Sequence, residues 1–559
     1  MTEVAIGGLA ASPGVAVGRV LLLDAPSEDE GPYRGAEVEA AAALSALAAL
    51  ADELGARAER MRTDGLEAEA EILDANRLMA LDPTLRTEVE TLTGTVTAGV
   101  ALRAATERHA ALIAALDDPM LAARATDVRE LGRRAARRLS EDAAVVTVEG
   151  PSVLLADDIG PADVADLRES DLEIVAIVLG SGAATSHAAI MARSLGLPMV
   201  VGAGKALLEA NAGTDVVVDG DAGRVYLAPE PERLAWGLGR AEQLARERRR
   251  HARERALPTV TLDGRWVTLL ANASTTVEVR AALETEAEGV GLLRTELAFL
   301  EARSWPTEDE HAAALSPLMA LLPGLVATVR VLDFGDDKTP PFLTGTETRG
   351  LALLLSNPEA LAAQLRAILR TAGGTDLRLL LPLTESAEQM RAVRRLLREA
   401  ASNVGWASAL PPLGAMIETP LAVRRAHEIA LEADFLSIGT NDLVQYTLGL
   451  DRAQPLATAR SAADPRVLSL IADTVAAAHE AGLTVEVCGE SASVPELATL
   501  YVGLGVDELS VAPARLDEVR TTVRRASSTD AAEAVVTALS GERGDEQGKT
   551  VGGLGGVRA

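Results

Sequence analysis

The chain has 559 residues, enough for about three domains with large cores. Hydrophobic residues make up 48% of it but aromatic residues only 2%, so Ala, Val, Leu and Ile must fill those cores, as in ordinary α/β proteins. The formal net charge of −29 at pH 7 argues against nucleic acid as a partner, because the phosphate backbone would be repelled, and favours a basic protein partner.

The sequence also bears on the cellular compartment. No apolar run is long enough to cross a bilayer, and the first residues lack the basic start and apolar stretch of a signal peptide. The single cysteine, Cys488, excludes an intrachain disulfide framework and fits a reducing compartment. We therefore expect a cytoplasmic protein without membrane insertion.

The first part of the chain alternates between strand-like and helical patterns. Residues 5–23 predict two short strands around a Ser-Pro-Gly turn. Helical periodicity then predicts four helices: Glu37–Arg62, Leu66–Ala80, Leu85–Asp117 and Ala122–Leu139. Strand-like runs return at Ala144–Val148, Val153–Leu155, Ile174–Leu179, Met199–Val201, Asp215–Asp219 and Arg224–Tyr226. The simplest architecture inserts a helical bundle (24–143) into a small α/β domain (1–23 and 144–228).

One motif in this α/β domain carries chemistry. In Gly180–His187, GSGAATSH, small residues lead to Thr185, Ser186 and His187, and an apolar helical run follows at once. This order places His187 at a helix N-terminus, where unpaired N–H groups attract anions. A neutral ring nitrogen can attack phosphorus, so the motif predicts a phosphorylated histidine. Thr185 could hydrogen-bond the ring or the phosphate, and Ser186 could cap the helix.

The alternative for any histidine is a surface or core position without chemistry. The chain has six histidines. Five of them lack the glycine-rich approach, the hydroxyls and the helix start: His109, His251, His311, His427 and His479.

The rest of the chain predicts a linker, a barrel and a tail. Residues 229–256 include an arginine-rich run. Because the chain as a whole has a large negative net charge, this run favours a solvated linker helix over a nucleic-acid-binding patch. Residues 257–540 then alternate strands with helices, as in a (β/α)8 barrel. The eight expected strands are Val267–Asn272, Gly289–Arg294, Val326–Leu332, Leu377–Leu381, Gly414–Glu418, Phe435–Gly439, Thr484–Cys488 and Glu508–Val511. The glycine-rich residues 541–559 predict a disordered tail.

Active residues of such barrels lie at the carboxyl ends of the strands. Glu418 ends one expected strand and Asp442 follows the next, 442 − 418 = 24 residues later, about one repeat. Two neighbouring strand ends would thus present two carboxylates to one point, and such oxygen ligands suit Mg²⁺. Either carboxylate alone could serve solubility or helix capping, whereas the pair favours a magnesium site.

Arginines also lie at these strand ends. Arg294 and Arg330 end or interrupt apolar strands, where a buried guanidinium needs an anion. That anion could be a phosphorylated carboxylic acid or, in the structural alternative, the side chain of Glu296 or Asp333. Three further cations could add charge to the same pocket: Lys338, Arg349 and Arg452.

Cys488 lies at another strand end, in the segment VEVCGE. Most lone cysteines in such positions are small core residues. Its place at the open face of the barrel also allows a role in proton transfer.

Taken together, these motifs resemble Enzyme I of the bacterial phosphotransferase system. The resemblance covers about residues 5–530. It rests on GLAASPGVAVG near the start, ATSHAAIMARSLGLPMVVG around His187, GVGLLRTELAFL, IETP, SIGTNDLVQYTLGLDR and VCGE.

The resemblance implies a fold and an activity. Residues 1–23 and 144–228 would be a swivelling phosphohistidine α/β domain, and the inserted helices 24–143 would bind the carrier protein HPr. Residues 257–540 would bind phosphoenolpyruvate and Mg²⁺ at the barrel mouth and form a homodimer. His187 would take the phosphoryl group of phosphoenolpyruvate and pass it to a histidine of HPr, the first step of sugar uptake.

It also implies roles for single residues. Phosphoenolpyruvate would be held by Arg294, Arg330, Asn441, Asp442 and Arg452. Glu418 and Asp442 would hold Mg²⁺, and Cys488 would donate the proton that converts enolpyruvate into pyruvate.

One region departs from the family pattern. Thr344–Ala352 reads TGTETRGLA where the family has an Asn-Pro-Phe-Leu-Gly stretch before an Arg-Gly-Ile-Arg run. Arg349 is kept, but Ala352 takes the place of the second arginine. Phe334–Lys338 reads FGDDK where Gly-Gly-Asp-Lys is expected. The changes bear on the affinity of the pocket rather than on the reaction.

Two other functions compete. A pyruvate phosphate dikinase or phosphoenolpyruvate synthase shares the histidine domain and barrel, but residues 24–143 show no glycine-rich nucleotide loop. A silent regulatory paralogue would fit the altered Thr344–Thr348 loop, but would not need His187, Glu418, Asp442 and Cys488 together.

Overall fold

The computed structural model describes residues 3–23, 32–63, 67–114, 125–139, 150–159, 172–182, 189, 192, 196–335, 338–346, 348–450 and 459–540. The expected strand Ala144–Val148 and the expected tail 541–559 lie outside these residues. The chain divides into two compact units, residues 1–247 and 248–559. No helix of the described residues is long and apolar enough to span a membrane.

The first unit contains an eight-stranded sheet in the order β1-β8-β7-β3-β4-β5-β6-β2. Its strands are β1 (Val4–Gly7), β2 (Leu9–Ser12), β3 (Val15–Leu22), β4 (Ser152–Ala156), β5 (Ile174–Leu179), β6 (Met199–Val201), β7 (Asp215–Asp219) and β8 (Arg224–Leu227). Strand β3 pairs in parallel with β4, so chain segments on both sides of the helical region join one sheet. This confirms the expected insertion of helices into an α/β domain.

The two strands expected around the Ser-Pro-Gly turn are β2 and β3, but the prediction missed a third strand, β1. Strand β1 pairs with β8 and β2 pairs with β6, at opposite ends of the sheet order. Gly8 alone separates the two strands. A Cβ at Gly8 would lie 2.6 Å from the Val201 carbonyl oxygen, so the crossing requires glycine.

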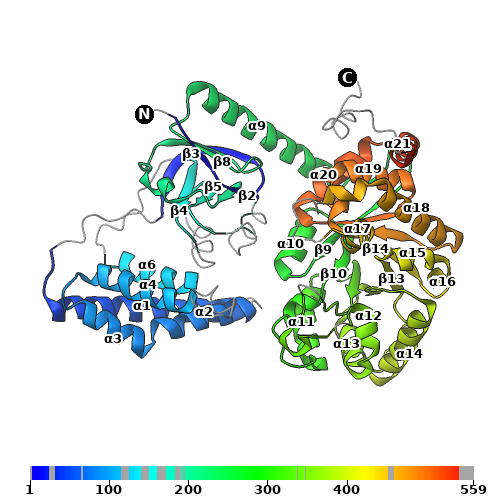
Figure 1. Cartoon of the computed structure of the whole chain (residues 1–559), viewed down its shortest axis with the longest axis horizontal. Coiled ribbons are helices and arrows are strands. Elements are labelled where there is room, and N and C mark those ends of the chain that lie inside the picture. The colour runs from blue at the N-terminus through cyan, green and yellow to red at the C-terminus, as the bar shows by residue number, and fades with distance from the viewer. Residues whose placement is uncertain are drawn as a thin grey trace. The chain divides into compact units, whose positions relative to one another are not determined.

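The inserted helices are α1 (Ala36–Thr63), α2 (Glu67–Ala80), α3 (Pro83–Leu92), α4 (Ala98–Ala114) and α6 (Ala125–Arg137). They run alongside one another in Figure 1 and bury a core made of Ala, Leu and Val. The single helix expected over Leu85–Asp117 is in fact two, α3 and α4. Thr93 caps the end of α3, and Gly94 follows in a turn, because a glycine and threonines disfavour helix continuation.

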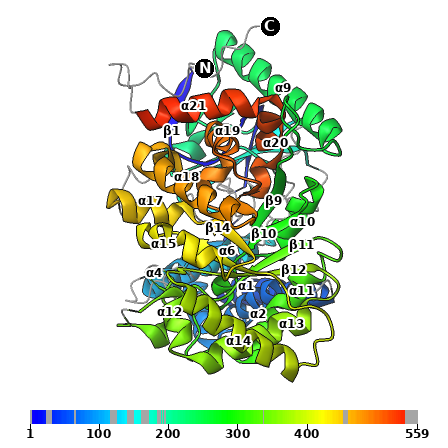
Figure 2. The same cartoon turned by 90° about the vertical axis from the view of Figure 1, so that its right-hand side faces the viewer.

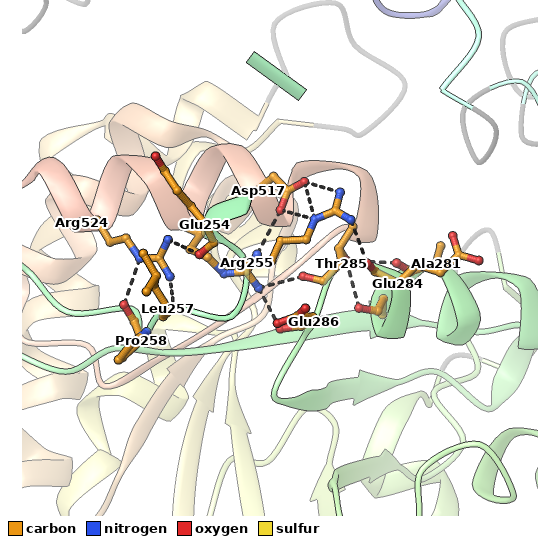
Figure 3. A network of polar contacts seen from close by, with 12 residues as sticks. Glu254, Arg255, Leu257, Pro258, Ala281, Glu284, Thr285, Glu286, Asp517 and Arg524 are labelled. Carbon is orange, nitrogen blue, oxygen red and sulfur yellow. Dashed lines mark hydrogen bonds and ion pairs between the residues drawn. The ribbon is translucent and has the colours of Figure 1, made fainter. Parts of the chain in front are cut away.

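Helix α9 (Pro231–Glu254) forms the expected linker helix, and polar contacts attach its end to the barrel. Figure 3 shows Arg255, just past α9, donating to both oxygens of Asp517 at 2.6–3.0 Å. Arg520 donates to the same carboxylate and to the carbonyl oxygens of Thr285 and Glu286. Asp517 therefore joins two arginines that would otherwise repel each other.

The second unit is a closed barrel of eight parallel strands, which confirms the expected (β/α)8 architecture. Figures 1 and 2 show helices surrounding the strands. The strands are β9 (Thr268–Ala273), β10 (Gly289–Leu293), β11 (Val326–Arg330), β12 (Asp376–Leu381), β13 (Leu413–Ile417), β14 (Phe435–Ile438), β15 (Val485–Val487) and β16 (Glu508–Val511). All eight expected strands are present, with ends shifted by at most two residues.

The helices of this unit are α10 (Thr276–Glu284), α11 (Glu308–Met319), α12 (Gly350–Leu355), α13 (Pro358–Thr371), α14 (Ala387–Asn403), α15 (Pro420–Arg424), α16 (Ala426–Ala430), α17 (Thr440–Leu448), α18 (Pro465–Glu480), α19 (Pro495–Leu504), α20 (Leu516–Arg525) and α21 (Ser528–Ser540). Their apolar faces pack on the outward-facing strand residues in one large core. Because all strands are parallel, their carboxyl ends meet at one rim, where the candidate site lies.

Candidate active site at the carboxyl end of the barrel

Arg330 is the centre of a buried charge cluster at this rim. It ends β11, and its side chain is 5% exposed. Its guanidinium donates to Glu296 Oε1 at 2.6 Å and pairs with Asp333 Oδ2 at 2.9 Å. Lys338 Nζ donates to the same Glu296 oxygen at 2.9 Å. The structural alternative for Arg330, pairing within the chain, is therefore present.

The cluster holds its charges at neutral pH. Burial would raise the pKa of Glu296, but Arg330 and Lys338 outweigh it and lower that pKa to about 2. Burial would likewise lower the pKa of Arg330, but the carboxylates around it raise the pKa instead. Glu296 accepts from two cations at one oxygen, while its other oxygen, Oε2, has no hydrogen-bond partner in the part of the chain that the structure describes. The two cations thus remain oriented at the rim with one carboxylate between them.

Glu418 follows β13 and is 1% exposed. Its Oε1 accepts a hydrogen bond of 2.6 Å from the backbone N–H of Leu383. A Cβ at Gly439 would lie 2.6 Å from Oε2, so the absence of a side chain there makes room for the carboxyl. Burial, then the charges of Asp442 and Asp333, raise the pKa of Glu418 well above its usual value. The effect of Asp442 on the pKa of Glu418 is thus consistent with the prediction that the two carboxylates lie near each other.

This pair fits a divalent cation. Two acidic side chains that repel each other in a buried site are stabilised when a cation lies between them. Among the described residues, no group of three or more His, Cys, Asp and Glu side chains is arranged to hold a metal. Glu418 and Asp442 would supply two ligands of such an ion, with substrate oxygens and water as the others.

Asn441 and Asp442 lie in the first turn of α17. Asn441 Oδ1 accepts from the backbone N–H of Glu490, which fixes the amide group near the end of β15. Asp442 Oδ1 lies 3.7 Å from Arg349 Nη2. Arg349 also contacts the Tyr446 hydroxyl, and its guanidinium lies 5.2 Å from the centre of that ring. Arg349 is therefore held at the metal-ligand side of the rim.

Arg294 differs from these cations. It directly follows β10, and the structure gives its half-buried side chain no ion pair or hydrogen bond among the described residues. The backbone N–H donates to the Ala273 carbonyl at 2.9 Å, so the position is fixed while the guanidinium stays available. The structural alternative for Arg294, pairing with Glu296 or Asp333, is not observed.

Cys488 follows β15 and is 1% exposed. It packs with Leu292, Leu380, Met416 and Phe435, which come from four other strands and face the barrel interior. Burial, with a contribution from Glu486, raises the pKa of the thiol to about 12. Its Sγ donates to the Ile438 carbonyl at 3.7 Å. Cys488 therefore carries its proton at neutral pH, in a core position that adjoins the rim.

Four expected site residues lie outside the described residues: Thr185, Ser186, His187 and Arg452. Other residues were missed by the sequence analysis. Asn272 Nδ2 donates to the Cys488 carbonyl at 3.0 Å, and Tyr446 contacts Arg349. An asparagine at the end of an apolar strand was the available signal for Asn272, whereas no sequence pattern marks Tyr446.

Three models of known protein families match most of the chain. The model of the PEP-utilising enzyme, PEP-binding domain, matches residues 248–528. The models of the mobile domain and the N-terminal domain of PEP-utilising enzymes match residues 148–223 and 7–124. The chain belongs to the family of PEP-utilising enzymes.

Within this family the chain is similar to phosphoenolpyruvate-protein phosphotransferases over nearly its full length. It is 36% identical to that of Streptomyces coelicolor over 566 residues, covering 97% of this chain and 98% of the relative. It is 33% identical to that of Geobacillus stearothermophilus over 560 residues, covering 96% of each.

The chain is also 37% identical over 486 residues to the multiphosphoryl transfer protein of Rhodobacter capsulatus, covering 84% of this chain. It spans about three-fifths of the length of such relatives, 58% and 63% in two cases.

Proposed function

We propose that the chain is a phosphoenolpyruvate–protein phosphotransferase. It transfers the phosphoryl group of phosphoenolpyruvate to His187 and then to a histidine of HPr, and it releases pyruvate, as the first step of sugar uptake by the phosphotransferase system. The observation that carries this proposal is the rim of the barrel, where the buried Arg330, other half-buried cations and the carboxylates of Glu418 and Asp442 lie at the strand ends. The names of the full-length relatives support it.

The cations account for an anionic substrate in an acidic protein. Arg294, whose guanidinium has no partner among the described residues, binds the phosphate or the carboxylate of phosphoenolpyruvate by charge-assisted hydrogen bonds. Arg330 and Lys338, held by Glu296, add positive charge at fixed positions. The remaining substrate contacts of the proposal are Arg349, Asn441, Asp442 and Arg452.

Glu418 and Asp442 hold Mg²⁺ in this proposal. The ion, when bound, neutralises negative charge on the phosphoryl oxygens and so favours nucleophilic attack. Arg330 lies close enough to Glu418 to lower its pKa, so the cation of the protein and the metal ligands share one electrostatic environment.

His187 and Cys488 perform the two chemical steps. A neutral ring nitrogen of His187 attacks phosphorus, with Thr185 and Ser186 supporting the ring and the phosphate. The bond from phosphorus to the enol oxygen breaks, and the enolate of pyruvate remains at the rim. Cys488, which holds its proton because its pKa is about 12, then protonates C3 of the enolate to give pyruvate.

The other parts of the chain have proposed roles too. The helices in residues 24–143 bind HPr, and the barrel in residues 257–540 forms a homodimer. Residues 1–23 and 144–228 carry the phosphohistidine, and residues 229–256 link the two. The net charge of −29 supports a partner with a basic face, and the single cysteine and the lack of a long apolar run support a cytoplasmic protein without membrane insertion.

Incubation of the protein with phosphoenolpyruvate, Mg²⁺ and purified HPr tests this function. We expect stoichiometric formation of pyruvate and phosphorylated HPr. Formation of phosphoenolpyruvate from ATP and pyruvate without HPr would instead indicate a dikinase or synthase. Absence of any phosphorylated protein would indicate a regulatory paralogue.

A further inference from the structure

A carboxyl group lies inside the barrel where the proposed function does not require one. Glu486 is on β15 and is 1% exposed. Neither of its oxygens has a hydrogen-bond partner in the described residues. A Cβ at Gly291, on β10, would lie 2.2 Å from Glu486 Oε1, so the carboxyl reaches across the interior towards that strand. Burying such a group without partners is costly, and an apolar residue would pack there at lower cost.

Glu486 is adjacent to Cys488. The two residues lie two positions apart along one strand, so their side chains face the same side, the barrel interior. Ser437 of β14 is paired directly with Glu486 in the sheet and is fully buried. Its hydroxyl makes no hydrogen bond among the described residues, so it can rotate towards either group, and its proximity lowers the pKa of the Glu486 carboxyl and of the Cys488 thiol. The serine is therefore a neighbour of both the acid and the thiol.

The surroundings of Glu486 keep it protonated at neutral pH. Burial, then the charge of Glu508, raise the pKa of Glu486 well above its usual value. Glu508 of β16 is paired directly with Glu486 in the sheet, and Arg378 of β12 donates to Glu508 Oε2 at 2.9 Å. Arg378 lowers the pKa of Glu486 but is engaged by Glu508, so the carboxylic acid form persists. Glu508, Arg378 and Cys488 are the titratable or charged side chains that act on Glu486 in these contacts.

We propose that Glu486 is a proton reservoir for Cys488, and that the Ser437 hydroxyl carries the proton between them. The inference rests on the proposed function, in which Cys488 protonates the enolate. It adds the group that restores the thiol after each turnover.

The proton transfer balances as follows for one turnover. The S–H bond of Cys488 breaks as the C3–H bond of pyruvate forms, which leaves a thiolate. Ser437 gives its hydroxyl proton to Sγ and takes the proton of the Glu486 carboxyl, so the serine is unchanged. Glu486 becomes a carboxylate beside Glu508 and regains a proton from water through Glu508, whose carboxyl is 8% exposed.

The test is burst kinetics of Glu486→Gln, which keeps the shape but removes the exchangeable acid. With phosphoenolpyruvate, Mg²⁺ and excess HPr, the wild type should form pyruvate at a constant rate from the first turnover. Glu486→Gln should form one pyruvate per site at the wild-type rate, because Cys488 begins protonated, and then slow by about tenfold or more. The KM for phosphoenolpyruvate should stay within about twofold.

Two further variants make the result specific. Ser437→Ala, which removes the bridging hydroxyl, should show the same burst if Glu486→Gln does not fold. Thr328→Val is the matched control, because the Thr328 hydroxyl is also buried in this barrel without a hydrogen-bond partner but lies on β11. It should keep wild-type kinetics.

The outcomes separate the inference from the function on which it rests. Equal slowing of the first and later turnovers, or unchanged kinetics in both Glu486→Gln and Ser437→Ala, would overturn the reservoir. An infrared band of a protonated carboxylic acid at pH 7 that disappears in Glu486→Gln would support the reservoir. If the band that disappears in this variant is instead that of a carboxylate, the reservoir is overturned. If the wild type takes no phosphoryl group from phosphoenolpyruvate, the proposed function itself is wrong, whatever the infrared result.

Discussion

Two arginines at the rim of the barrel lie in opposite electrostatic settings. Arg330 is buried between Glu296 and Asp333, whereas the described residues give Arg294 no partner. Replacing Arg294 by Gln should therefore raise the KM for phosphoenolpyruvate by about tenfold or more, with unchanged stability, because only a substrate contact is lost. Steady-state kinetics together with urea unfolding measure both effects.

Replacing Arg330 by Gln should lower stability as well as activity. It leaves Glu296 buried with Lys338 as its remaining cation, and removing one partner of a buried ion pair costs about 3–5 kcal/mol. A substantial loss of stability in Arg294→Gln, or none in Arg330→Gln, would contradict the assignment of one arginine to substrate and the other to the charge cluster.

His311 on α11 predicts a pH-dependent stability. It is 1% exposed, neither ring nitrogen has a hydrogen-bond partner within the described residues, and burial lowers its pKa to about 4. Between about pH 6.5 and 4 the unfolded chain binds this proton and the folded chain does not, so stability falls as the pH falls, by up to about 3 kcal/mol. His311→Phe should remove this part of the pH dependence, as urea unfolding at pH 7 and pH 5 would measure. An unchanged pH dependence would show that the ring is not buried in neutral form.

At the residue scale, the sequence predicted the rim but not the contacts within it. The interval between Glu418 and Asp442 was readable because strand–helix repeats have a regular length. Glu296 pairs with Arg330 and not with Arg294. This choice depends on the directions in which the side chains point after β10 and β11. Glu486 was missed because a single glutamate in the short run VEV does not reveal which side of a barrel strand it faces.

At the scale of elements, one polar network attaches α9 to the barrel. Asp517 on α20 accepts from Arg255, as Figure 3 shows, and from Arg520. The Arg520 side chain is 4% exposed. Asp517→Ala should destabilise residues 248–559 by about 2–4 kcal/mol, because two arginines then share the position without a carboxylate. Asp530→Ala on α21, where no ion pair is found among the described residues, is the control. Thermal unfolding should show a clear loss for the first variant and almost none for the second.

Strands and helices were predicted where one periodicity dominates. All eight barrel strands are buried apolar runs separated by helical segments, so their pattern is unambiguous. The break between α3 and α4 was missed because Thr93 and Gly94 interrupt a run whose apolar period continues on both sides. Likewise, no local pattern states that β1 and β2 join opposite ends of one sheet, since strand pairing is set by distant segments.

At the scale of the whole molecule, the account requires a divalent cation. In the proposed function Glu418 and Asp442 provide two ligands, so a chelator should abolish the transfer of the phosphoryl group from phosphoenolpyruvate, and Mg²⁺ should restore it. Glu418→Gln, which removes one ligand but preserves shape, should require a much higher Mg²⁺ concentration. Full activity of the wild type in the presence of a chelator would exclude these two carboxylates as metal ligands of the reaction.

The order of parts along the chain was readable from the sequence because each part has a distinct pattern and the motifs lie in a fixed order. The N-terminal, mobile and PEP-binding domain models match residues 7–124, 148–223 and 248–528, in that order along the chain. The proposed function also requires His187 to reach the rim, and no local sequence pattern reports how that would happen.

The most direct test of the central claim is labelling by radioactive phosphoenolpyruvate with Mg²⁺, in the wild type and in His187→Ala. The account predicts acid-labile label on the wild type and none on the variant, while both fold and bind Mg²⁺ equally. Equal labelling of the His187→Ala variant would contradict it.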